Sequence, residues 1–495
     1  MIRLSLEEKK EIGYQYVLDR LDPASPYGIK RLRTEGFYTP GDRNELDREL
    51  DNVGILKKAL ETDRTAVLDF RQKLAGLKDL SGTFSRCQNG YVLTEVELFE
   101  LRSFCTRINE MLPIAQHLLE YGPLNDILFS DMEKPLKILK PDRSGSIGFY
   151  IEDSRTPELL KARTEKREIE RQLRMLRDQP EEENETLLKK RQDAAAAEEK
   201  ALEMIYSDLS AAVSSFMPLF QKNAEAAGRL DAALAKAILA EHFGCVRPQI
   251  GGNELVLWDA VHPQAAAALE AGNRSFSPVS IRMPKGVTVL TGANMGGKSV
   301  ALRTVLLNTA LALSGFFVFC SEAKVPAFTS IELISRDLSD IEIGLSSFGA
   351  EILRFNEAAE RIPADGLSLI VMDEFARGTN AGEGAAIVRA SVKYLSDQNA
   401  VTLLATHYDG AAEFAAKHYQ VKGLKNKGRI GPDESETVQL PKGGTGYSAE
   451  NVFYKISNAM DYGLIEVSRG TECPCDAVSI CRMLGMPKQI LDDLD

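Results

Sequence analysis

The stretch Gly292-Ala-Asn-Met-Gly-Gly-Lys298-Ser299 matches the pattern G-x₄-G-K-S and follows an apolar run at residues 287–291. Apolar residues at helical spacing come after it, so the pattern predicts a glycine-rich turn between a strand and a helix. Such a turn points backbone N–H groups at phosphate oxygens, and the helix adds its positive N-terminal end. We therefore expect a phosphate-binding loop made of Gly292, Ala293, Asn294, Met295, Gly296, Gly297, Lys298 and Ser299.

Two side chains of this loop suit a nucleotide with its metal ion. Lys298 would reach the β- and γ-phosphates of ATP, and the Ser299 hydroxyl would be a ligand of Mg²⁺. The alternative is a glycine turn that merely joins a strand to a helix. The motif and its context agree, which favours the phosphate loop, with ATP and Mg²⁺ as cofactors.

Two further apolar runs each lead to polar residues. Residues 369–372 precede Asp373 and Glu374, and residues 401–405 precede Thr406 and His407. Hydrolysis of ATP needs one carboxylate near Mg²⁺ and another group that orients or deprotonates the attacking water. We assign Asp373 to the metal ion, Glu374 to the water and His407 to the γ-phosphate. The alternatives are solvated acids at a strand end and a histidine that only packs.

The sequence pattern changes near residue 244. Before that point apolar residues recur at the three- and four-residue spacing of helices, as at Leu46, Leu50 and Val53. After it, short apolar runs alternate with helical patterns, which is the arrangement of an α/β nucleotide-binding domain. The predicted fold class is α plus α/β, with a helical domain over 1–244 and a P-loop α/β domain over 245–495.

A helical hairpin is predicted within the first half, at about 156–209. Two charge-dense helical segments, 156–178 and 185–209, flank the turn-forming residues 179–184. Each arm would be about 35 Å long at roughly 1.5 Å per residue. Acidic and basic residues are nearly balanced along the arms, which favours a solvated projecting hairpin over a dedicated nucleic-acid clamp.

Composition narrows the classes of function. The net charge of −12 and the pI near 5.2 disfavour a protein coated in basic surface, although a local DNA-binding face remains possible. The longest apolar stretch, 305–320, contains Asn308 and Ser314 and fits a buried helix better than a membrane span. The N-terminus lacks the apolar core of a signal peptide, so we expect a cytoplasmic protein.

Seven cysteines, an odd number, indicate reduced thiols rather than a disulfide framework. Three of them, Cys473, Cys475 and Cys481, form the only cluster in the sequence. Three soft ligands without an obvious fourth favour structural thiols, and a metal site is the alternative.

Taken together, TGANMGGKS, MDEFARGTNAGEG and ATHY resemble the ATPase domain of the MutS mismatch-repair family, over roughly 245–495. The resemblance implies an ABC-type ATPase with a C-terminal helical dimerisation segment. Ser346 lies in a segment similar to the family's S-T-F-x-x-E signature, whose serine is offered to nucleotide bound by the opposing subunit. Phe276, with His262-Pro263, resembles the segment in which an aromatic ring stacks on adenine, and Asn294 matches an asparagine of the family's loop.

The first half resembles the family's core and lever regions less closely. The mismatch-reading domain with its Phe-x-Glu wedge and the connector domain have no counterpart in this sequence, and the clamp region is short. Within the loop, Ala293 replaces a proline and Val300 a threonine. The resemblance thus implies a short form that binds ATP without mismatch reading.

Three functions are considered, of which the first two are what the family resemblance implies. The first is a nucleotide-switched homodimer or MutS-like heterodimer that associates with duplex or branched DNA. The second is an ATPase that reactivates or remodels a protein partner, such as a cobalamin-dependent aminomutase. The third, a nucleotide-gated scaffold with negligible turnover, is disfavoured because it would not need Glu374.

Overall fold

The computed structural model describes residues 4–139, 151–175, 181–292, 297–335, 347–424 and 460–473, with a few positions after residue 480. The chain forms two compact units that alternate along the sequence. One contains Met1–Leu21, Glu35–Gly54 and Lys236–Asp495, and the other contains Asp22–Thr34 and Ile55–Ala235. The segments 1–21, 35–54 and 236–244 therefore group with the α/β part of the chain. The mixed helical and sheet composition agrees with the predicted fold class.

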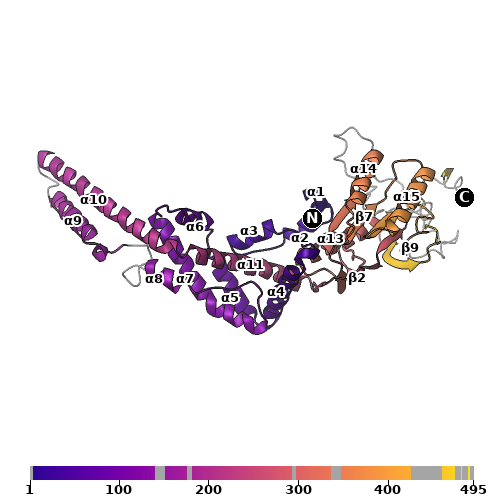
Figure 1. Ribbon diagram of the computed structural model, residues 1–495, viewed down its shortest axis with the longest axis horizontal. Coiled ribbons are helices and arrows are strands. Elements are labelled where there is room, and N and C mark those ends of the chain that lie inside the picture. The colour runs from indigo at the N-terminus through magenta and orange to yellow at the C-terminus, as the bar shows by residue number, and fades with distance from the viewer. Residues whose placement is uncertain are drawn as a thin grey trace, which may run out of the picture. The chain divides into compact units, whose positions relative to one another are not determined.

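A six-stranded sheet is the centre of the first unit, and Figure 1 shows its strands beside α13, α14 and α15. Five neighbouring strands are parallel, and the edge strand β10 is antiparallel to β9. In spatial order the strands are β10 (Met460–Val467), β9 (Lys417–Leu424), β4 (Gly286–Thr291), β8 (Ala400–Thr406), β7 (Ser368–Asp373) and β6 (Ser330–Ile334).

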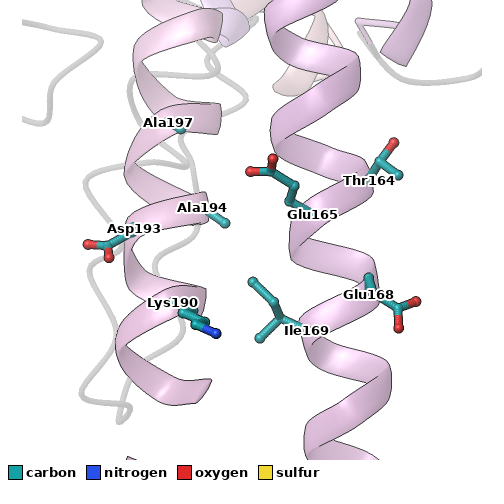
Figure 2. Close-up of a pocket in the computed structure, with 8 residues that line it drawn as sticks. All are labelled: Thr164, Glu165, Glu168, Ile169, Lys190, Asp193, Ala194 and Ala197. Atoms are coloured by element: carbon teal, nitrogen blue, oxygen red, sulfur yellow. The ribbon is translucent and has the colours of Figure 1, made fainter. Parts of the chain in front are cut away.

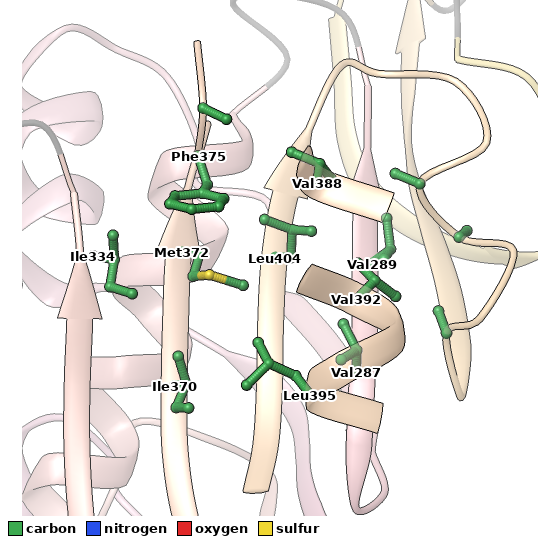
Figure 3. Packing of buried hydrophobic residues seen from close by; sticks show 14 of the residues in the cluster. Val287, Val289, Ile334, Ile370, Met372, Phe375, Val388, Val392, Leu395 and Leu404 are labelled. Atoms are coloured by element: carbon green, nitrogen blue, oxygen red, sulfur yellow. The ribbon is translucent and has the colours of Figure 1, made fainter. Parts of the chain in front are cut away.

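The central strands are buried and largely apolar, as expected where helices cover the sheet. Every residue of β4 and β8 is buried, as are the first five residues of β7. Figure 3 shows side chains of these strands against Val388, Val392 and Leu395 of α15 (Ala381–Ser396). This core holds the strands in one register, which sets where their polar ends lie.

A second, four-stranded sheet belongs to the same unit, in the order β1 (Gln249–Ile250), β5 (Glu322–Val325), β2 (Leu255–Ala260) and β3 (Val279–Met283). The remaining helices and the 3₁₀ turn of this unit are α1 (Leu6–Glu11), α2 (Tyr14–Leu18), η1 (Pro40–Asp42), α12 (Pro263–Ala271), α13 (Lys298–Ala312) and α14 (Ser347–Glu360). Two long helices, α4 (Arg43–Thr62) and α11 (Met217–His242), have residues in both units.

A buried ion cluster fixes the chain just beyond the C-terminal end of α13. The Nζ atom of the fully buried Lys236 lies 2.8 Å from Glu35 and 2.7 Å from Glu49, and it donates to the Ser314 carbonyl at 3.3 Å. The Tyr14 hydroxyl donates to the Ser314 hydroxyl at 2.9 Å. The residues that follow α13 are thus bonded both to the N-terminal segment and to α11.

The second unit is helical. It comprises α3 (Pro26–Thr34), α5 (Arg64–Ala75), α6 (Ser81–Gln88), α7 (Glu95–Leu118), η2 (Leu119–Tyr121), α8 (Glu133–Leu139), η3 (Asp153–Arg155), α9 (Pro157–Met175) and α10 (Glu181–Ser214). Phe84, Phe104 and Phe220 pack together in its core, with ring centroids 5.6–5.9 Å apart. Among the helices that the structure describes, none has both the length and the apolar character needed to cross a membrane.

The helices α9 and α10 run antiparallel over the segment predicted to form a hairpin. Arg163 near the start of α9 pairs with Glu198 of α10, and Glu170 farther along α9 pairs with Arg191. The two helices therefore run in opposite directions. The second arm is longer than the sequence suggested, since α10 continues to Ser214.

Candidate nucleotide site

The ends of three parallel strands meet at one edge of the six-stranded sheet. Thr291 of β4 pairs with Thr406 of β8, and Asp373 of β7 pairs with Ala405 of β8. The residues that follow these strands, Gly292, Glu374 and His407, therefore emerge at the same level. This is the edge where ligands bind in open α/β sheets.

The glycine loop ends where α13 begins. Gly297 is the residue before the helix and has a left-handed φ of 83°. A Cβ atom at this position would lie 2.9 Å from the Tyr462 ring, so both conformation and space require glycine. Ala293, Asn294, Met295 and Gly296 lie outside the described residues.

Lys298 is buried at the start of α13. Its Nζ donates to the Gly292 carbonyl at 2.7 Å and lies 3.9 Å from a Glu374 carboxylate oxygen. Burial lowers the pKa of Lys298, and the negative charges of Glu374 and Asp373 oppose this shift. The ammonium group thus reaches across the mouth of the loop, between its first residue and the end of β7.

Asp373 and Ser299 bring two side-chain oxygen groups together between the end of β7 and the start of α13. Burial raises the pKa of Asp373, and a hydrogen bond with the Ser299 side chain acts against this rise. Within the described part of the chain, Asp373 Oδ1 is buried without a hydrogen-bond partner. A buried carboxylate oxygen without a donor suits a cation, and Mg²⁺ commonly uses one or two protein oxygens with phosphates and water completing its shell. The residues therefore fit this metal ion.

Glu374 occupies a strained turn directly after β7. Its φ is 53°, and Ala376 two residues later has a φ of 62°. Each left-handed non-glycine residue costs about 1–3 kcal/mol, so such a turn persists only where its surroundings hold it. The Arg377 guanidinium forms an ion pair with one Glu374 carboxylate oxygen, and the other oxygen faces Lys298.

Two side chains hold the Ala376 peptide groups. Ala376 N donates to a Glu351 carboxylate oxygen at 3.0 Å, and the Tyr408 hydroxyl donates to the Ala376 carbonyl at 3.2 Å. The sequence motifs predict no role for Glu351, Arg377 or Tyr408. The contacts of Glu351 and Tyr408 join segments far apart in the chain, which no local pattern could predict.

His407 follows β8 on the same edge. Its Nδ1 atom is buried and has no hydrogen-bond partner among the described residues. Burial lowers the pKa of His407, while the Glu374 carboxylate raises it. A neutral imidazole beside Glu374 can give or accept a hydrogen bond at a ligand, and its contact with the γ-phosphate stays a prediction.

His262 and Phe276, which the resemblance places in the adenine-binding segment, lie in different surroundings from each other. His262 caps α12: its Nδ1 accepts from Ala265 N at 3.3 Å, and its Nε2 donates to the Ile12 carbonyl at 3.0 Å. Phe276 is half-buried in the connection between α12 and β3. Ser346 lies outside the described residues, and α14 begins at the next position.

Cys473 is near this edge, although its sequence motif suggested a separate cluster. Its N–H donates to Asp409 at 2.8 Å. Burial and the Asp409 carboxylate raise the pKa of Cys473 to about 12, and the Lys298 charge acts in the opposite direction. The thiol is therefore protonated at neutral pH when no metal ion is bound. Cys475 lies outside the described residues, so the metal alternative stays a prediction.

A cavity of about 550 Å³ lies between α9 and α10 in the helical unit (Figure 2). Ile169, Ala194 and Ala197 form apolar parts of its lining, together with Thr164. Its charged lining residues are Glu165, Glu168, Asp193 and Lys190. A lining with three carboxylates and one ammonium group is a poor match for a phosphate backbone.

Comparison with known proteins agrees with this geometry. The family model described as MutS domain V matches residues 288–450. The DNA mismatch repair protein MutS of Natronomonas pharaonis is 33% identical over 242 residues, covering 48% of this chain and 28% of that protein. The corresponding MutS of Leuconostoc mesenteroides is 26% identical over 434 residues, covering 84% of this chain and 49% of that protein.

The MutS of Aquifex pyrophilus is 34% identical over 230 residues, covering 45% of this chain and 25% of that protein. In each case the matched segment is less than half of the relative's length. The matches extend along much of this chain, and the domain V match contains the phosphate loop, Asp373, Glu374 and His407. Residues 288–450 thus match MutS domain V, and the chain is similar to MutS proteins along much of its length.

Proposed function

We propose that this protein binds Mg²⁺-ATP and hydrolyses it at the edge of the six-stranded sheet. The observation that carries the proposal is the convergence of Lys298, Ser299, Asp373 and Glu374. A lysine 3.9 Å from a carboxylate, beside a buried carboxylate oxygen without a donor, is a charge arrangement suited to a polyphosphate and its cation.

Each side chain has a distinct role in this proposal. Lys298 exchanges the Gly292 carbonyl for phosphate oxygens, and Ser299 with Asp373 holds Mg²⁺. The ion, when bound, neutralises negative charge on the phosphates. Glu374 orients the attacking water and accepts its proton, and His407 contacts the γ-phosphate. The presence of Glu374 on a turn so closely held disfavours a scaffold without turnover.

The direct test of the site is Lys298→Ala. We expect tight ATP binding to be lost, because the charge opposite the β- and γ-phosphates is removed. Lys285→Ala is the matched control, since Lys285 is exposed just before β4 and its Nζ donates to the Asn399 side chain. Titration with a fluorescent ATP analogue measures both. Unchanged affinity in Lys298→Ala would reject the site.

The active species in this proposal is a nucleotide-switched dimer, either a homodimer or a heterodimer with another MutS-like chain. Ser346 completes the nucleotide site of the neighbouring subunit, and Phe276 stacks on adenine. Family resemblance supports both roles, and α14 begins directly after Ser346.

A mixed dimer tests sharing of the site. When Ser346→Ala is paired with Lys298→Ala, the subunit with an intact lysine receives an intact serine from its partner. Recovery toward half of wild-type ATPase activity supports sharing. A confirmed heterodimer without recovery contradicts it, provided that a dimer of wild type with Lys298→Ala is active.

We further propose that the ATP cycle controls association with duplex or branched DNA, without mismatch reading. The support is that the relatives are DNA mismatch repair proteins. A protein partner, such as an aminomutase-type enzyme, is the second candidate, and the carboxylates of the hairpin cavity favour it.

DNA binding measured at several salt concentrations distinguishes the two candidates. Real phosphate contacts lose affinity steeply as salt rises. If this protein has no measurable affinity for duplex or branched DNA at low salt, that result would favour the proposal of a protein partner.

A further inference from the structure

The turn that carries Glu374 is fastened to α14 by contacts that the roles above do not use. The Glu351 carboxylate accepts from the Ala376 N–H at 3.0 Å, and Glu351 is only 6% exposed. One turn farther along α14, the Phe355 ring stacks on Phe375, with centroids 5.2 Å apart and an interplanar angle of 27°. Both contacts reach the residues immediately after Glu374.

A third contact lies at the N-terminal end of α14. Gly378 packs so closely on Phe348 that an added Cβ atom would lie 2.9 Å from the Phe348 Cβ. The first, second and third turns of α14 therefore each touch the segment 375–378. A displacement of this helix would displace the segment with it.

We propose that Glu351 is a positioning residue for hydrolysis, which holds Glu374 in place through the Ala376 N–H and couples α14 to the water-orienting carboxylate. The proposal rests on the role of Glu374 given above. In this proposal Glu351 acts on Glu374 through the turn, by way of its hydrogen bond with the Ala376 N–H.

The backbone of the turn explains why such a group is needed. Glu374 and Ala376 both have left-handed φ values, a conformation that costs non-glycine residues free energy. A side-chain oxygen that accepts from the Ala376 N–H helps to hold this conformation. The Tyr408 hydroxyl donates to the Ala376 carbonyl, and Glu351 accepts from the Ala376 N–H. The two side chains therefore hold Ala376 from both sides.

The position of Glu351 also gives the coupling a direction. It lies five residues after Ser346, on the helix that begins at Ser347. If Ser346 contacts the neighbour's nucleotide, the same helix connects that contact with the water-orienting group of its own subunit. Occupancy of one site would then change the hydrolytic rate of the other.

The test uses Glu351→Leu and Glu351→Gln in the full chain. Leucine removes the hydrogen-bond acceptor while still filling the buried space. We expect the rate of single-turnover hydrolysis to fall by about tenfold or more, because small misplacements of a reacting group have large effects on rate. ATP affinity should stay within about threefold, because the loop and Lys298 are untouched. Glutamine keeps a carbonyl acceptor and should retain most of the rate. Glu360→Gln, an exposed change on the same helix, is the matched control.

A double-mutant cycle separates positioning from general damage. In a Glu374→Ala background, Glu351→Leu should cause no further loss of hydrolysis, because the group that it positions is gone. Additive losses, or a Glu351→Leu variant with wild-type hydrolysis, would overturn the proposal. If Glu351→Leu does not fold, a folded Glu351→Gln that loses hydrolysis as severely as Glu374→Ala also overturns it. A wild-type protein without ATPase activity would instead refute the proposed function.

Discussion

Replacing Gly297 by alanine should affect both the fold and nucleotide binding, and the structure allows its cost to be divided. A left-handed alanine costs about 1–2 kcal/mol. The new Cβ atom would also lie 2.9 Å from the Tyr462 ring, whereas carbon atoms pack best at about 3.5–4.0 Å, so the ring or loop must shift at a further cost of roughly 1–3 kcal/mol. We expect the free energy of unfolding to fall by about 2–5 kcal/mol in total.

Gly244→Ala is the matched control. Gly244 has a φ of 65°, and an added Cβ atom there would meet nothing within 4 Å. It lies in the same compact unit as Gly297, so its replacement carries the conformational cost without the steric one. Urea unfolding followed by circular dichroism gives both values, and their difference is the cost of the contact with Tyr462.

The same two variants separate stability from binding. Gly297 immediately precedes Lys298, so its displacement should weaken ATP binding by about tenfold or more, the equivalent of about 1.4 kcal/mol. Gly244→Ala should leave ATP affinity unchanged. The double variant with Tyr462→Ala should regain the steric part of the stability but not the conformational part. Equal destabilisation by Gly297→Ala and Gly244→Ala, with ATP affinity unaffected in both, would refute this account of the loop.

Two further predictions concern the carboxylates. Glu374→Gln should keep ATP affinity but slow hydrolysis by about 10²-fold or more, as for loss of a positioned base; near-normal turnover in rapid-quench experiments would exclude Glu374 from that role. Asp373→Asn should raise the free energy of unfolding at neutral pH while weakening Mg²⁺ binding. Burial raises the pKa of Asp373 in the folded state, so ionisation destabilises the fold above that pKa, and the destabilisation disappears below the unfolded value of about 3.9. Urea unfolding at several pH values checks the sign, and a variant less stable than wild type at neutral pH contradicts it.

Local patterns were sufficient to predict the strand ends and the helix after the loop. The apolar runs before Gly292, Asp373 and His407 are β4, β7 and most of β8, because buried parallel strands need continuous apolar sequence. The helix expected after the glycines begins at Lys298. Spacing within a motif carries this information directly.

Contacts between distant segments could not be predicted in the same way. The hydrogen bond between Glu351 and Ala376 depends on how α14 lies against the end of β7, which no residue pattern encodes. His262 shows the same limit, since its partners are a local N–H and the carbonyl of Ile12, 250 residues earlier in the chain. The grouping of residues 1–21 and 35–54 with the α/β unit likewise comes from tertiary packing.

Hydrogen bonds just beyond the C-terminal end of α13 hold that end of the helix in place, so we expect α13 to pivot around it. Ser314 is held by Lys236 and Tyr14, and the Leu313 carbonyl accepts from Tyr38 N at 2.7 Å. The 15 residues of α13 span about 22 Å at roughly 1.5 Å per residue. A shift of about 1 Å at Lys298 would therefore become a tilt of about 3° around the fixed end rather than a sliding motion. A tilt of α13 around this end would act on the hydrogen bonds that Ser314 makes with Lys236 and Tyr14.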